Sequence, residues 1–133
     1  MPALEPVVGV RVVATPASID DATWTPSAGT AVWRTAPDEA FAWRPDASVT
    51  VDLDDPDAII EPEHGFVAAK LSTADLERLG RHVDMPLPTD RPALVQGKVA
   101  GVPVRLGLLA GGGAVLLVHA AHADDLRGRL GWR

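Results

Sequence analysis

Residues 65–79 read Gly65-Phe-Val-Ala-Ala-Lys-Leu-Ser-Thr-Ala-Asp-Leu-Glu-Arg-Leu79, and the hydrophobic period changes within this segment. Its first half, residues 65–71, is mostly apolar and is a strand candidate. Ser72-Thr-Ala-Asp75 then has the form of a helix capping box. Apolar side chains follow at helical spacing, at Leu76, Leu79 and Val83. The segment therefore predicts a strand that leads directly into a helix, which ends before Pro86.

The rest of this half predicts three more strands and a second helix. These are expected at 93–100, 102–110 and 114–119, with the helix from Ala121 onward. Gly101 and the run Gly111-Gly-Gly113 separate the strands as tight turns. Leu126 and Leu130 lie four residues apart on the last helix, whose acidic residues come first and whose basic residues come last. That order suits the helix dipole.

The first half of the chain reads as strands joined by turns. Strands are expected at 7–14, 30–34, 40–44 and 48–53, with a loop at 15–29 and an acidic connection at 54–64. The strands around Pro37-Asp38 should form a hairpin that brings Trp33 near Trp43. We therefore expect an α+β fold, an antiparallel or mixed sheet with about two helices packed on it. Residues 1–133 are expected to form a single domain, with a strand-rich part at 1–64 and a strand-helix-strand-strand-strand-helix part at 65–133.

Composition limits the function classes. The chain has 133 residues and no cysteine, so disulfides and thiolate metal sites are excluded. It starts without a basic or apolar leader and has no membrane-length apolar run, which makes the cytoplasm the expected location. Arginine, alanine and glycine abound, as in GC-rich bacterial coding.

Charge is unevenly distributed in this acidic protein. Residues 1–90 carry 6 basic and 16 acidic side chains, whereas residues 91–133 carry 6 basic and 2 acidic ones. Scattered basic residues in a chain of net charge −6 argue against binding of nucleic acid or anionic lipid.

No pattern predicts catalysis or metal binding. His119 and His122 are three residues apart but have no third ligand nearby, and they straddle a strand-to-helix boundary. The acidic residues at 52–57 lack the glycine of a calcium-binding loop, and Gly111-Gly-Gly113 leads into a strand, unlike a phosphate-binding loop. Ser72 suits a helix cap better than a nucleophile. We expect no catalytic residue, no cofactor and no metal site, although an active site assembled from distant residues stays open.

A partner interface is the remaining hypothesis. Tryptophan is enriched at binding hot spots, and Trp132 near the chain end is the best placed of the four. Trp24 lies in a loop, where it could either anchor the loop to the core or contact another chain. The candidate interface residues are Trp24, Trp132, Arg127, Arg129 and Arg133.

Several short motifs resemble one known family. Val32-Trp-Arg-Thr-Ala-Pro-Asp-Glu-Ala-Phe-Ala-Trp43 is similar to a tryptophan, Gly-Pro-Asp-Glu and aromatic strand pattern, with Ala36 in place of the glycine. The segments 67–74, 99–104 and 115–130 match later strands and helices of the same pattern. The family is the gamma subunit of heterotetrameric sarcosine oxidase, whose fold resembles that of the glycine-cleavage T-protein.

This resemblance covers residues 30–132 and implies a small non-catalytic subunit. Flavin and folate chemistry would then belong to larger partner chains. The leading hypothesis is an accessory subunit or protein-interaction domain that packs against a larger protein. The alternatives are a stand-alone small enzyme or ligand-binding domain and a homo-oligomeric structural domain.

Overall fold

The computed structural model describes residues 2–132. It confirms the α+β class, because antiparallel strands are combined with helices. The elements in order are β1 (Glu5–Pro6), β2 (Val8–Val13), α1 (Pro16–Asp20), β3 (Thr23–Thr25), β4 (Ala31–Ala36), β5 (Glu39–Arg44), β6 (Thr50–Asp52), β7 (Ile59–Glu63), β8 (Phe66–Leu71), α2 (Thr73–Leu79), β9 (Ala93–Val99), β10 (Val102–Leu108), β11 (Ala114–His119) and α3 (Ala120–Leu130).

Two compact units divide these elements. The C-terminal unit comprises Met1–Pro6 and Gly65–Arg133, and the N-terminal unit comprises Val7–His64. Each unit has its own sheet and its own hydrophobic cluster.

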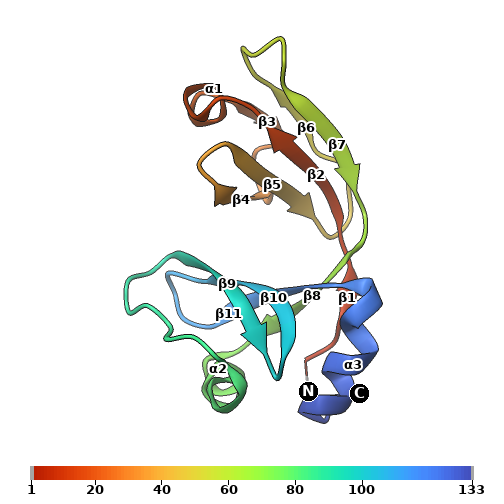
Figure 1. The fold of residues 1–133 in the computed structure, drawn as a ribbon, viewed down its shortest axis with the longest axis vertical. Helices are drawn as coiled ribbons and strands as arrows, with labels where there is room; N and C mark the ends of the chain where they lie inside the picture. Colours follow the sequence, from red (N-terminus) through yellow and green to blue (C-terminus); the bar gives the residue numbers. More distant parts are fainter. Residues whose placement is uncertain (1, 133) are drawn as a thin grey trace. The chain divides into compact units, whose positions relative to one another are not determined.

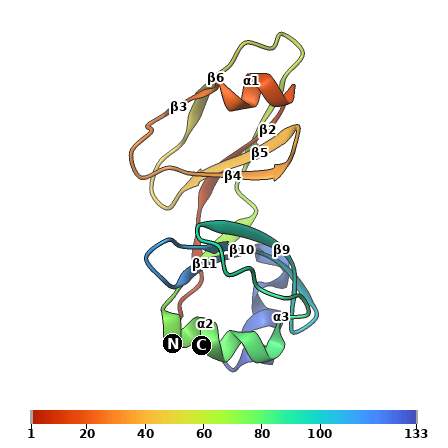
Figure 2. The ribbon, with the colours of Figure 1, turned by 90° about the vertical axis from the view of Figure 1, so that its left-hand side faces the viewer.

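The C-terminal unit is a five-stranded antiparallel sheet covered by two helices. Its strand order is β1-β8-β11-β10-β9. Figures 1 and 2 show α2 and α3 on the same side of this sheet. Alternate residues of β10 and β11, such as Leu106 and Leu116, point to that side and are fully buried. Leu79 from α2 and Leu126 from α3 complete this core.

The start of α2 follows the predicted capping box. The Ser72 hydroxyl accepts the N–H of Asp75 at 3.1 Å, and the Asp75 carboxylate accepts the N–H of Ser72 at 3.0 Å. The α-helix ends at Leu79, earlier than the apolar spacing predicts, and residues Gly80–His82 form one turn of 3₁₀ helix. Val83 therefore lies beyond the helix and bridges to Val99 of β9 instead, but it still packs against the core.

Both predicted turns of this unit are present. Ala100 and Gly101 have φ of 50° and 79° between β9 and β10, as a tight two-residue hairpin requires. Gly113 has φ of 72°, and a Cβ there would lie 2.4 Å from the carbonyl oxygen of Leu71. Only glycine fits that position. The last helix begins at Ala120, and the Nδ1 of His119 accepts the N–H of Ala121 at 3.2 Å.

The N-terminal unit contains a four-stranded antiparallel sheet in the order β4-β5-β2-β7. The predicted β4–β5 hairpin is confirmed, with an irregularity between Arg34 and Ala36. The rings of Trp33 and Trp43 meet edge to face with centroids 5.4 Å apart. On the other face, Val10 and Val12 lie in a smaller core that the two-stranded sheet of β3 and β6 helps to cover.

Two expectations for this unit are wrong. The predicted loop at 15–29 contains α1 and β3, both too short to leave a periodic signal. The predicted connection at 54–64 contains β7, which pairs with β2. Two prolines and several acidic residues obscured this strand, but Pro62 is compatible with an edge strand because its missing N–H can face away from the sheet.

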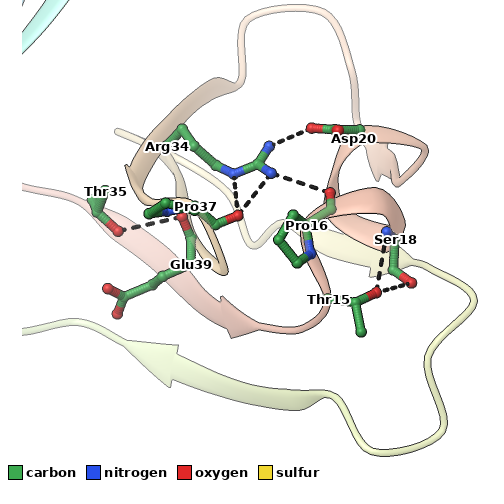
Figure 3. Close-up of polar contacts among 8 residues, drawn as sticks. All are labelled: Thr15, Pro16, Ser18, Asp20, Arg34, Thr35, Pro37 and Glu39. Atoms are coloured by element: carbon green, nitrogen blue, oxygen red, sulfur yellow. Dashed lines mark hydrogen bonds and ion pairs between the residues drawn. The ribbon is translucent and has the colours of Figure 1, made fainter.

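Arg34 fastens α1 to the β4–β5 hairpin (Figure 3). Its guanidinium donates to the Asp20 carboxylate at 2.7 Å and to the Pro16 carbonyl at 3.1 Å. It also donates to the Pro37 carbonyl in its own hairpin, at 2.9 and 3.1 Å. The Thr15 hydroxyl caps α1 by accepting the N–H of Ser18 at 3.3 Å. This short helix therefore depends on contacts distant in sequence.

Candidate partner-binding surface

Trp132 borders a hollow on the helical side of the C-terminal unit. Gly131 ends α3 in the left-handed conformation, with φ of 70°, and the N–H of Trp132 then donates to the Arg127 carbonyl at 2.9 Å. The indole is half-buried and packs against the core of this unit. The hollow has a volume of about 270 Å³ and is lined by Pro2, Asp75, Arg78, Leu79, His82, Leu130 and Trp132.

The rim of this hollow carries an ionised pair. The Asp75 carboxylate accepts from the backbone N–H of Ser72 and from Arg78 at 2.8 Å. These contacts, the Ser72 backbone bond first, lower the pKa of Asp75 below its ordinary value. The hollow is therefore lined by both apolar and charged side chains, a combination also found in protein interfaces.

The two described arginines of the predicted interface already have intramolecular partners. Arg127 lies 2.7 Å from the Asp124 carboxylate one turn earlier. Arg129 donates to the Ala100 carbonyl at 2.7 Å and lies 3.9 Å from Asp125. Arg129 thus fastens α3 to the β9–β10 turn. Arg133 lies outside the described residues.

Trp24 lies in the N-terminal unit, on β3, directly across from Val51 of β6. It is half-buried and packs against the core of that unit. This packing is what the sequence analysis expects if Trp24 anchors its segment to the core. The interface assignment of Trp24 stays a prediction.

A second apolar surface lies along β7 and was not predicted. Ile59 and Ile60 are 49% and 48% exposed, although isoleucine is usually buried. A hollow of about 420 Å³ lies beside the strand, and Ile60 and Pro62 line it together with Val10 and Val51. The signal in the sequence was the pair of isoleucines inside an otherwise acidic and proline-containing segment.

Some of the residues with potential for chemistry make local structural contacts. Across residues 2–132, no group of three or more histidine, aspartate or glutamate side chains is arranged to hold a metal ion. The rings of His119 and His122 have centroids 6.2 Å apart, and His119 caps α3. In the acidic segment, Asp55 accepts the N–H groups of Thr15 and Asp57. No helix in the described part of the chain is long and apolar enough to cross a membrane.

Comparison with solved structures finds a similar fold in a chain of the heterotetrameric sarcosine oxidase from Corynebacterium sp. U-96, in complex with pyrrole 2-carboxylate. The TM-score is 0.69 at 13% sequence identity, and the match covers 97% of this chain and 81% of that one. This likeness confirms the resemblance seen in the sequence at the level of the fold. No protein-family model matches the chain, and no curated protein matches it.

Proposed function

We propose that this protein is a non-catalytic accessory subunit that packs against a larger partner chain. The single observation that carries the proposal is the fold shared with a chain of a heterotetrameric enzyme along 97% of the present sequence.

From the family resemblance of the sequence motifs, the proposed partner is an oxidoreductase complex that carries flavin and folate chemistry in its larger chains. The protein would then work in the cytoplasm of a bacterium. Its own contribution would be to stabilise or complete the assembly.

The surface around Trp132 supports this role. A half-buried indole that lines a hollow together with apolar and charged side chains offers a large rigid contact area at low entropic cost. Aromatic anchors of this kind, surrounded by a polar rim, dominate the binding energy of many interfaces.

The direct test is isolation of a tagged full-length chain from its native host, followed by gel filtration and mass spectrometry. We expect it to elute with a larger chain at a fixed stoichiometry. Trp132→Ala should then weaken the complex by about 30-fold, the effect of a hot-spot residue worth roughly 2 kcal/mol. Leu109→Ala is the matched control, because Leu109 is an exposed apolar residue of the same unit that does not line this hollow.

A stable, monodisperse monomer that captures no larger chain would contradict the proposal. Light scattering that gives a defined multiple of the 14.0 kDa chain, with no second protein, would favour the homo-oligomeric alternative.

A further inference from the structure

The C-terminal sheet carries a further hollow, on the face opposite its two helices. Arg105 of β10 and Leu117 of β11 alternate with the buried residues that point toward the helices, so they point to the other face. The two residues are register partners, and both line this hollow, whose volume is about 490 Å³. The described residues that line it belong to one unit, so its chemistry follows from that unit alone.

The polar lining of this hollow is basic. Lys98 of β9 and Arg105 line it together with His119 and His122 from the start of α3. No aspartate or glutamate of the described C-terminal unit lines it. Lys98 is exposed and forms no ion pair among residues 2–132. In a chain of net charge −6, such a concentration of basic groups favours an anion at this place.

Ring contacts hold two of these groups in place. The Arg105 guanidinium carbon lies 4.9 Å from the centroid of the Phe66 ring, a cation–π contact. The His119 ring meets the same phenylalanine edge to face, with centroids 5.6 Å apart. Because the Nδ1 of His119 accepts the N–H of Ala121, the proton of the neutral ring lies on Nε2, which can donate to an anion.

The remaining lining is mainly apolar. Phe66, Pro103 and Leu117 supply an aromatic ring, a proline ring and a branched side chain. Small-molecule sites have volumes of roughly 300–1,000 Å³ and combine apolar walls with a few polar groups that fix the orientation of the ligand. The hollow fits both criteria, so an apolar body as well as a negative charge is expected of its ligand.

We infer that this hollow binds a small organic anion, a carboxylate or a phosphate attached to a flat apolar ring system. The oxyanion pairs with the Lys98 ammonium group and accepts a hydrogen bond from His119. Arg105 adds positive charge, and the ring system lies against Pro103 and Leu117. The inference goes beyond the accessory role and does not depend on it, because the lining residues come from this chain.

The test uses three probes that share a naphthalene ring. 2-Naphthoate carries a carboxylate, 2-naphthyl phosphate carries a phosphate and 2-naphthamide is uncharged. We expect both anions to shift the amide NMR signals of Gly97, Lys98 and His122 in the full-length chain, with saturation. The uncharged amide should bind at least about tenfold more weakly, because it lacks the charge that Lys98 neutralises. The tighter of the two anions identifies the class of the natural ligand.

The two lysines of the chain provide a matched pair of variants. Lys98→Gln should weaken binding of the anions by about tenfold and leave that of 2-naphthamide unchanged. Lys70→Gln is the control, because it makes the same change in charge at an exposed position of the same sheet, on β8, outside the hollow. Both lysines are exposed, so both variants should fold.

Each remaining outcome overturns the inference. Equal affinity for 2-naphthamide and the two anions would mean that the hollow is only an apolar patch. Wild-type affinity of Lys98→Gln for both anions would place the anion elsewhere. Exclusion of both anions in the complex isolated from the native host would assign the hollow to a contact with the larger chain. Failure of the chain to capture a larger protein would overturn the accessory role alone, since these titrations use the chain by itself.

Discussion

The cores of the two units differ in size. Among residues 2–132, the main buried cluster of the C-terminal unit contains 12 residues and lies under two helices, whereas that of the N-terminal unit contains 7 and has a hollow beside β7. Charge follows the same division, because the C-terminal unit carries 9 basic and 7 acidic side chains and the N-terminal unit 3 and 11. The two units therefore differ both in the size of their buried cluster and in their balance of charge.

Substitutions in the enclosed core should be the most damaging. Leu126 of α3 is 0% exposed, whereas Ile60 of β7 is 48% exposed. Leu126→Ala should lower the free energy of unfolding by about 3 kcal/mol, through lost burial and a cavity. Ile60→Ala should cost less than about 1 kcal/mol, because solvent already reaches the side chain. Urea denaturation followed by circular dichroism measures both values. Equal losses in the free energy of unfolding would mean that the two positions contribute equally to stability, contrary to their difference in burial.

Substitution of Gly9 tests whether the interior of the N-terminal sheet tolerates added side-chain volume. A Cβ at Gly9 would lie 2.5 Å from the Phe41 ring and 2.9 Å from the Glu63 carbonyl oxygen. Gly9→Ala should therefore cost about 1–3 kcal/mol by overpacking. Gly111→Ala is the control, because nothing lies within 4 Å of a Cβ there. Urea denaturation measures the free energy of unfolding of both variants. A Gly9→Ala variant as stable as the wild type would mean that the sheet interior accommodates the extra methyl group.

Gly128 should give a smaller effect of opposite sign. It lies inside α3, and a Cβ there would meet nothing within 4 Å. Gly128→Ala should raise the thermal midpoint, with a gain of roughly 0.5–1 kcal/mol from helix propensity. Gly131→Ala is the counterpart, since φ of 70° at that position disfavours alanine and the midpoint should fall. A drop for both variants would show that α3 is less regular than its hydrogen bonds indicate.

The smallest expected effect is on the pH dependence of the free energy of unfolding. The pKa of Asp75 is lowered from its ordinary 3.8 by the Ser72 backbone N–H and then by Arg78. A lowered folded-state pKa means that ionised Asp75 stabilises the fold above about pH 3.8, and that this contribution is lost as pH falls through the folded-state value. Asp75→Asn should therefore make stability less dependent on pH in that acidic range, as unfolding at several pH values would show. Glu77→Gln on the same helix is the matched control for the loss of one carboxylate, because Glu77 forms no ion pair among residues 2–132.

Elements with local signals were predictable from sequence, and elements fixed by distant contacts were not. Ser72 and Asp75 form the predicted capping box, and the hairpins at Pro37-Asp38 and Gly101 are where turn residues placed them. β7 exists because Ile60 and its neighbours pair with β2, about fifty positions away in the chain, while local proline and acidic residues argue against a strand.

The candidate interface also includes contacts between distant parts of the chain, which could not be predicted from the sequence. Trp132 lines a hollow, but the sequence could not reveal that Pro2 and α2 form the other walls. The structure places Arg127 against Asp124, three residues earlier on the same helix, and Arg129 against the Ala100 carbonyl. The first contact could be read from helical spacing, whereas the second depends on the tertiary fold.

The pairing of β1 with β8 makes the fold modular. The chain passes between the units only after Pro6 and after His64, and Pro6 lies opposite Val67 in this ladder. Topologically, the N-terminal unit is a continuous insertion whose entry and exit are joined as neighbouring strands. Its 58 residues could be exchanged for another domain, or for a short turn, without rerouting the backbone of the helix-covered sheet. The two units are therefore free to diverge at different rates.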